Sequence, residues 1–157
     1  MICYHIRVIN RLAITILATK EPKMGSENHP VREVLRNVVK NAEINAEQVK
    51  ELEQFVRKDW VIDEEEAWLL FRVNKALGSD HLECPEWTEF FVSTISRFVV
   101  MDMNSPGEID EAEGDWLANM LEEYSVDNDT ERKLIYELQK TTTSISGKLG
   151  QRFQSLD

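Results

Sequence analysis

Five residues between Asp102 and Glu113 have the types and spacing of ligands for a hard cation. This segment reads Asp-Met-Asn-Ser-Pro-Gly-Glu-Ile-Asp-Glu-Ala-Glu. A twelve-residue calcium loop supplies oxygen ligands from positions 1, 3, 5, 7, 9 and 12, and a glycine at position 6 makes its turn. With Gly107 at position 6, the sequence predicts one weak site for Ca²⁺ or another divalent cation. Its ligands would be the side chains of Asp102, Asn104, Asp110 and Glu113 and the carbonyl of Glu108.

The same residues also have the pattern of a helix start that needs no metal. Pro106 stands at ligand position 5, where it offers no side-chain oxygen. Asp110 would cap a helix, Glu113 would close a capping box with it, and Gly107 would turn the chain. The sequence leaves the cation site and the plain helix cap open as alternatives.

The chain around this segment is predicted to be all-α. Apolar residues recur at helical spacing from Pro30 onwards, and no segment alternates as a strand does. Helix starts are marked by Asn45 with Gln48, Asp63 with Glu66, and Asn128 with Glu131. Gly78 marks a helix end and Pro85 a restart. The last helix is expected to carry residues from Leu134 through Ile145 to Phe153, with a break near Gly147.

The second half of the sequence repeats the pattern of the first at one constant offset, without a gap. This offset aligns apolar positions, such as Leu52 with Leu117, and helix caps, such as Asn45 with Asp110. Similar helices share apolar spacing by periodicity alone, but caps in the same register need a closer relationship. We therefore expect a single compact domain of six to seven helices, built from two duplicated units near 31–78 and 86–140. In the first unit none of the positions that would bind through a side chain holds a carboxylate, so any cation site is single.

The overall charge bears on the class of partner. The chain has 18 basic and 29 acidic residues, a formal charge of −11. This balance argues against nucleic acid, whose binding needs Lys and Arg to neutralise phosphates, and against an anionic membrane surface. A basic protein partner fits better. No nucleophile–base pair or known catalytic motif is visible, so a non-enzymatic role is expected.

Residues 1–29 are predicted to be an N-terminal segment outside the helical domain of 30–150, with 151–157 as a tail. Residues 1–23 carry a charge of +3, which leaves −14 for the remainder. Their longest apolar run, Leu12–Ala18, is far shorter than the roughly 20 residues that span a membrane. A signal peptide, a loosely attached segment and translation from Met24 remain alternatives.

Neither cysteine lies in a metal-binding or disulfide spacing. Cys3 and Cys84 stand alone, which favours a reducing, cytoplasmic setting. Asp80, His81, Glu83 and Cys84 lie within five residues, but the second ligand pair of a zinc site is absent from the sequence. The four tryptophans, at 60, 68, 87 and 116, are expected in the core or between helices.

Short motifs resemble the TerB-like tellurite-resistance family. They are the Gly107-Glu-Ile-Asp110…Glu113 helix start, Trp87…Phe90-Phe91, and Asp115-Trp116-Leu117. The resemblance covers roughly 30–150. It implies an all-helical domain with an acidic loop in each half, associated with divalent cations, and a stress-linked binding or scaffold role. The first half departs from this pattern, because Ala42 replaces the glycine and Asn45 the aspartate, so no metal is expected there.

Overall fold

The computed structural model describes residues 30–59, 62–78, 84–101, 106–125 and 129–154. Within these ranges the chain forms seven helices and two strands of two residues each. The helices are α2 (Pro30–Asn41), α3 (Ala46–Asp59), α4 (Glu64–Leu77), α5 (Pro85–Val100), α6 (Glu111–Glu123), α7 (Asp129–Thr141) and α8 (Gly147–Gln154). The strands are β1 (Glu108–Ile109) and β2 (Ser144–Ile145). The prediction of a single all-α domain with six to seven helices is confirmed.

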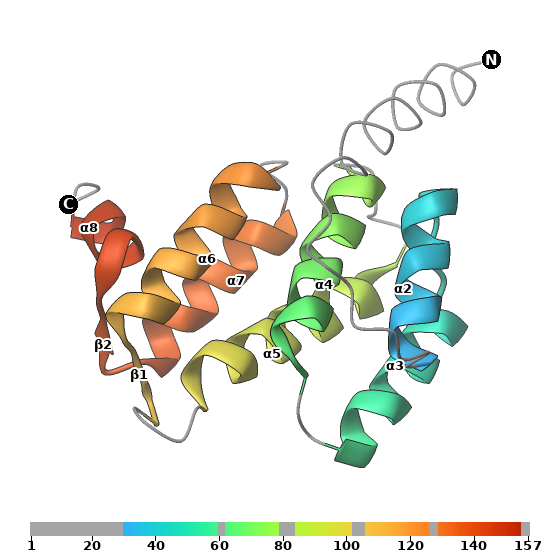
Figure 1. The fold of residues 1–157 in the computed structure, drawn as a ribbon, viewed down its shortest axis with the longest axis horizontal. Coiled ribbons are helices and arrows are strands. Elements are labelled where there is room, and N and C mark those ends of the chain that lie inside the picture. The colour runs from blue at the N-terminus through green and yellow to red at the C-terminus, as the bar shows by residue number, and fades with distance from the viewer. Residues whose placement is uncertain (1–29, 60–61, 79–83, 102–105, 126–128, 155–157) are drawn as a thin grey trace.

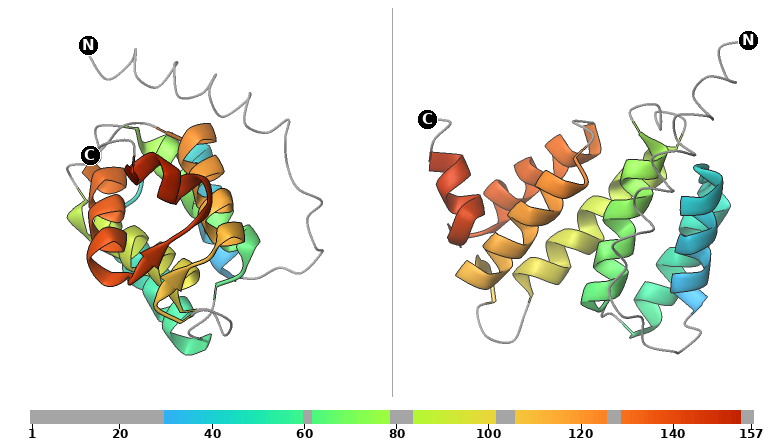
Figure 2. Two further views of the ribbon diagram at one scale, coloured as in Figure 1. Left: turned by 90° about the vertical axis from the view of Figure 1, so that its left-hand side faces the viewer. Right: turned by 45° about the horizontal axis from the view of Figure 1, so that its top comes forward.

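The helices follow one another along the long axis of the molecule. Helices α2 and α3 lie at one end, α8 and the two strands lie at the other, and α4 to α7 fill the space between (Figure 1). The same order is visible when the molecule is tilted (Figure 2, right). Helix α2 packs on α4, α5 on α7, and α6 on α8. The core therefore extends through the whole array.

Helix α4 lies at the centre of this core. Ten of its fourteen residues are buried, so it presents no wholly exposed face. Full burial of a large apolar side chain contributes about 1.5–3 kcal/mol, an upper estimate because unfolded chains are partly compact. The largest fully buried side chains come from both ends of the sequence: Trp87, Phe71, Phe91, Leu35, Leu52, Leu69, Leu70, Ile95, Ile109, Leu117, Leu134 and Leu138.

The structure reproduces the internal repeat. Helices α3 and α6 begin at Ala46 and Glu111, and α4 and α7 begin at Glu64 and Asp129, so both pairs keep the offset that aligns the two caps. Packing follows the same shift, because α2 on α4 corresponds to the end of α5 on α7, and α3 on α5 corresponds to α6 on α8. The second unit thus starts within α5 and includes α8.

The end of the chain differs from the sequence prediction. Instead of one helix carrying Ile145, helix α7 ends at Thr141, and Ile145 lies in β2, which pairs in parallel with β1. Thr141, Thr142 and Thr143 are β-branched residues, which disfavour a helix. Their neighbours in β2 gain backbone partners in β1 instead. Helix α8 then runs across residue 150, where the sequence placed the domain limit.

Glycines allow α6 and the start of α8 to approach closely. A Cβ on Gly114 would lie 2.1 Å from the carbonyl oxygen of Ser146, and one on Gly147 would lie 2.6 Å from the carbonyl oxygen of Glu111. Both contacts are too short for any larger residue without a backbone shift. Gly147 also has a φ of +66°, which side chains disfavour.

Candidate functional site

Asp110 and Glu113 form a reciprocal capping box at the start of α6. The backbone N–H of Glu113 donates to Asp110 Oδ1 at 2.9 Å, and the N–H of Asp110 donates to Glu113 Oε2 at 3.0 Å. Two N–H groups that the helix cannot pair are thereby satisfied. Of the two alternatives that the sequence left open, the helix cap is present in the structure.

The remaining predicted ligands fall into two groups. Glu108 is exposed in β1, whereas Asp102 and Asn104 lie outside the described residues. Among the residues that the structure describes, no group of three or more His, Cys, Asp or Glu could hold a metal ion. The cation site therefore remains a prediction that depends in part on residues outside the described ranges.

Gly107 makes the turn that the sequence assigned to it. Its φ is +87°, a value that glycine adopts far more readily than other residues. Its N–H donates to the carbonyl of Val100 at 2.9 Å, and its carbonyl accepts from the N–H of Thr143 at the same distance. Gly107 is thus bonded both to the last residue of α5 and to Thr143, the residue before β2.

The first unit makes the same cap with uncharged side chains. At the start of α3, the N–H of Gln48 donates to Asn45 Oδ1 at 2.9 Å, and the N–H of Asn45 donates to Gln48 Oε1 at 3.0 Å. Asp63 and Glu66 form a third box at the start of α4. The predicted caps at the starts of α3, α4 and α6 are confirmed, and the cap itself requires no negative charge. Asn128, the predicted cap of α7, lies outside the described residues.

The second unit concentrates negative charge around α6. From 106 to 125 there are seven acidic residues and no lysine or arginine. Acidic side chains in the first turn of α6 are stabilised by the positive end of the helix dipole. Glu122 and Glu123, however, lie at the negative end. Basic groups reach this end from other helices. Lys75 Nζ donates to the carbonyl of Glu123 at 2.7 Å, and Arg152 pairs with Glu122 at 3.1 Å.

A buried polar contact joins α4 to the end of α6. Trp68 Nε1 donates to the Tyr124 hydroxyl at 2.8 Å, and burial raises the pKa of Tyr124 above its ordinary value. The guanidinium of Arg72 lies 4.5 Å from the centre of the Trp68 ring. Sequence reasoning missed the Trp68–Tyr124 pair, because its members are 56 residues apart and no local pattern links them.

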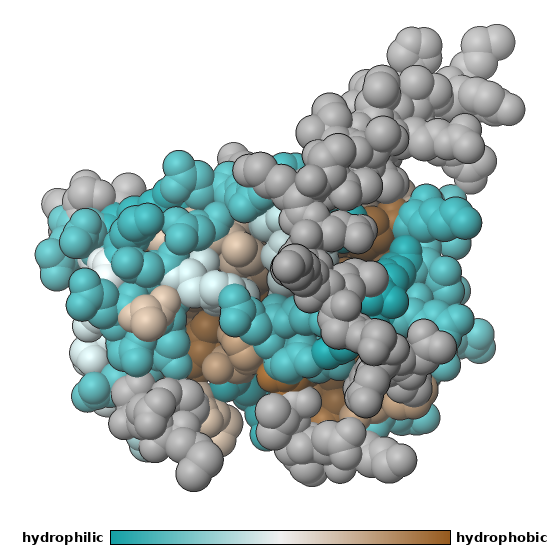
Figure 3. Space-filling model, viewed as in Figure 1, coloured by the Kyte–Doolittle hydropathy of each residue, from teal (hydrophilic) through white to brown (hydrophobic). Residues whose placement is uncertain are grey.

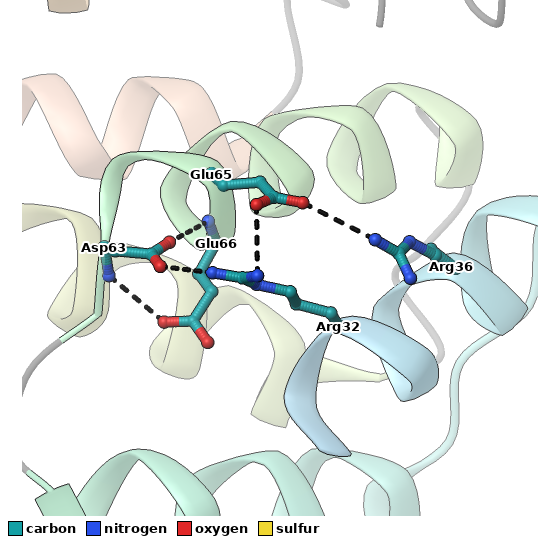
Figure 4. A network of polar contacts seen from close by, with 5 residues as sticks. All are labelled: Arg32, Arg36, Asp63, Glu65 and Glu66. Atoms are coloured by element: carbon teal, nitrogen blue, oxygen red, sulfur yellow. Dashed lines mark hydrogen bonds and ion pairs between the residues drawn. The ribbon is translucent and has the colours of Figure 1, made fainter. Parts of the chain in front are cut away.

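A network of charges joins α2 to the start of α4 (Figure 4). Arg32 pairs with Asp63 and with Glu65, and Arg36 also reaches Glu65, at 3.5 Å. Burial lowers the pKa of Arg32, but the hydrogen bond and charges of these acids outweigh it, so the pKa is raised. With side chains only 13% and 17% exposed, Arg32 and Glu65 form a less screened pair than a surface one. Its role in the fold is to fix α2 on α4.

Cys84 is buried at the start of α5. A helix N-terminus ordinarily lowers the pKa of a thiol. Here burial is the largest influence, and the pKa of Cys84 is raised instead. The zinc alternative involves Asp80, His81 and Glu83, which lie outside the described residues.

Three tryptophans lie where the sequence placed them. Trp68 and Trp87 are buried, and Trp116 is half-buried between Phe71 and Phe98. Trp60 lies outside the described residues. Among the described residues, no helix is long and apolar enough to cross a membrane.

Comparisons with family models, with curated proteins and with solved structures find no match for this chain.

The neutral box of the first unit predicts how α6 tolerates substitution. Asp110→Asn with Glu113→Gln should keep the free energy of unfolding within about 0.5 kcal/mol, because both cap bonds can still form. Asp110→Ala should cost about 1 kcal/mol, because the cap acceptor is lost. Urea unfolding of the three proteins measures this difference. Equal losses in both variants would show that the charge, rather than the cap, stabilises the helix.

Proposed function

We propose that this protein is a non-enzymatic interaction domain that binds a basic protein partner through an acidic surface on β1 and α6. The observation that carries the proposal is the run of seven acidic residues without a basic one from 106 to 125. Such a surface raises the association rate with a basic partner and disfavours acidic ones.

Exposure supports this surface. Glu108, Glu111, Glu122 and Glu123 are all exposed, whereas the carboxylates of Asp110 and Glu113 are committed to the helix cap. Helix α3, by comparison, mixes acidic residues with Lys50 and Arg57. Figure 3 shows that the face seen in Figure 1 is largely hydrophilic, with hydrophobic residues exposed in its lower half and in a smaller area at the upper right. A partner would therefore meet mostly polar groups on that face.

Neutralising the exposed acids should weaken capture of the partner. Glu108→Gln with Glu111→Gln should reduce the recovery of basic proteins from cell extract several-fold at low salt, because two exposed negative charges are removed. The capping box is untouched, so the fold should be kept. Glu47→Gln with Glu51→Gln is the matched control, since Glu47 also lies in the first turn of a helix and both residues are exposed. Quantitative mass spectrometry over a salt series measures recovery. Equal recovery by both double variants, or recovery that does not fall with salt, would contradict the proposal.

A second candidate function is weak binding of a divalent cation at the start of α6. The capping box places Asp110 and Glu113 together at one helix start, where their carboxylate oxygens are suitable ligands for a hard cation. Asp102 and Asn104 would complete the site.

Calcium titration tests this candidate. The parent chain should release or absorb heat at millimolar Ca²⁺, and Asp110→Asn with Glu113→Gln should abolish the signal while keeping the fold. No heat from the parent chain, or unchanged heat from the variant, would contradict the cation site.

The TerB-like resemblance adds a proposed setting. A stress-linked scaffold in the cytoplasm, in the manner of tellurite-resistance proteins, is consistent with an all-helical domain of two related units. The short motifs carry this part of the proposal, and the acidic-surface experiment does not depend on it.

A further inference from the structure

One side of α7 is open to solvent even though it contains a large aromatic residue. We call this side the α7 face and define it by Arg132, Lys133, Tyr136 and Lys140. All four residues are exposed, and Tyr136 is 66% exposed. The opposite side of α7, with Leu134 and Leu138, is buried in the core.

The repeat identifies the covered counterpart of this face on α4. The offset between the two units relates Lys133, Tyr136 and Lys140 to Trp68, Phe71 and Lys75. Side chains and a carbonyl of α6 and Tyr124 contact these positions, and Phe91 of α5 also packs on Phe71, with ring centres 5.2 Å apart. Phe71 meets Trp116 edge-on with ring centres 6.0 Å apart, and Lys75 donates to the carbonyl of Glu123.

Of the three positions on α4 that contact α6 and Tyr124, two have a residue of the same kind on the α7 face. Tyr136 preserves the aromatic ring of Phe71, and Lys140 preserves the lysine of Lys75. Within the described residues, no equivalent of α6 follows α7. The chain instead continues into α8, which packs on α6 at the end of the molecule (Figures 1 and 2). No described element covers Tyr136.

Charge indicates what kind of helix would fit. The helix that covers α4 is acidic and has no basic residue. The α7 face presents three basic side chains, and exposed Asp129, which pairs with Arg132 at 2.8 Å, lies on the same side, so the positive charges remain in excess. An acidic amphipathic helix thus complements this face in both charge and apolar contact.

We propose that the α7 face is a docking surface for an acidic amphipathic helix of another protein, which lies on α7 as α6 lies on α4. Aromatic residues of that helix pack on Tyr136, and its C-terminal carbonyls accept from Lys140. Helix α6 of a second copy is not the occupant, because its apolar side is already buried against its own neighbours. This surface is separate from the acidic one on α6 and takes a partner of opposite charge.

A peptide of residues 108–125 serves as the probe, because it has the chemistry of the helix that covers α4. Labelled peptide is titrated with the full chain, and binding is followed by fluorescence anisotropy. Tyr136→Ala with Lys140→Gln should weaken binding by about tenfold or more, as expected when an aromatic anchor is removed. Lys50→Gln on α3 is the matched charge control and should leave binding within about twofold.

Two further measurements separate this proposal from its rivals. Circular dichroism of the variants checks that they stay folded, which exposed substitutions should allow. A peptide with the same residues in scrambled order should bind at least about tenfold more weakly, because it lacks one apolar side. The proposal is overturned if the peptide does not bind at millimolar concentration, if the double variant binds as the parent does, or if the scrambled peptide binds equally well.

Discussion

The need to pair the first N–H groups of each helix sets the register of this fold. Three helix starts meet it in one way, with reciprocal side-chain bonds at Asn45 and Gln48, Asp63 and Glu66, and Asp110 and Glu113. Since equivalent helices begin at one constant offset, the same helix pairs meet in both halves of the molecule. The cores of the two units then join through α4, which is buried on nearly all sides.

The two units share their cap geometry but differ in charge. The first unit caps α3 with amides, whereas the second caps α6 with carboxylates of closely similar geometry. The excess of negative charge on α6 is therefore not required by the cap. It is partly offset by Lys75 and Arg152, which come from helices on either side. The remaining negative charge on α6 would attract a basic partner, whereas the basic residues on α7 would attract an acidic one.

Local signals explain which features could be predicted from the sequence. The members of a capping pair lie within one helical turn, so the sequence predicts the starts of α3, α4 and α6 correctly. The turn at Gly107 is also predicted correctly, because glycine readily adopts the positive φ that the turn needs. The β1–β2 pairing and the Trp68–Tyr124 bond were missed, because each joins segments that are far apart in the sequence. The break after Thr141 has a local cause in three consecutive threonines. The sequence nevertheless predicts a continuing helix there, because Ile145 and Leu149 have helical spacing. The cation site stays a prediction, since it combines described residues with Asp102 and Asn104.

Amide hydrogen exchange tests the capping account most directly. In an uncapped helix the first-turn N–H groups are open to water, whereas a capping box protects the third one. The account predicts slow exchange at Gln48, Glu66 and Glu113 relative to the two residues before each. Comparable protection at Gln48 and Glu113 is expected, because amide and carboxylate caps have the same geometry. Fast exchange at all three positions, or protection at Glu113 alone, would contradict a cap shared by both units.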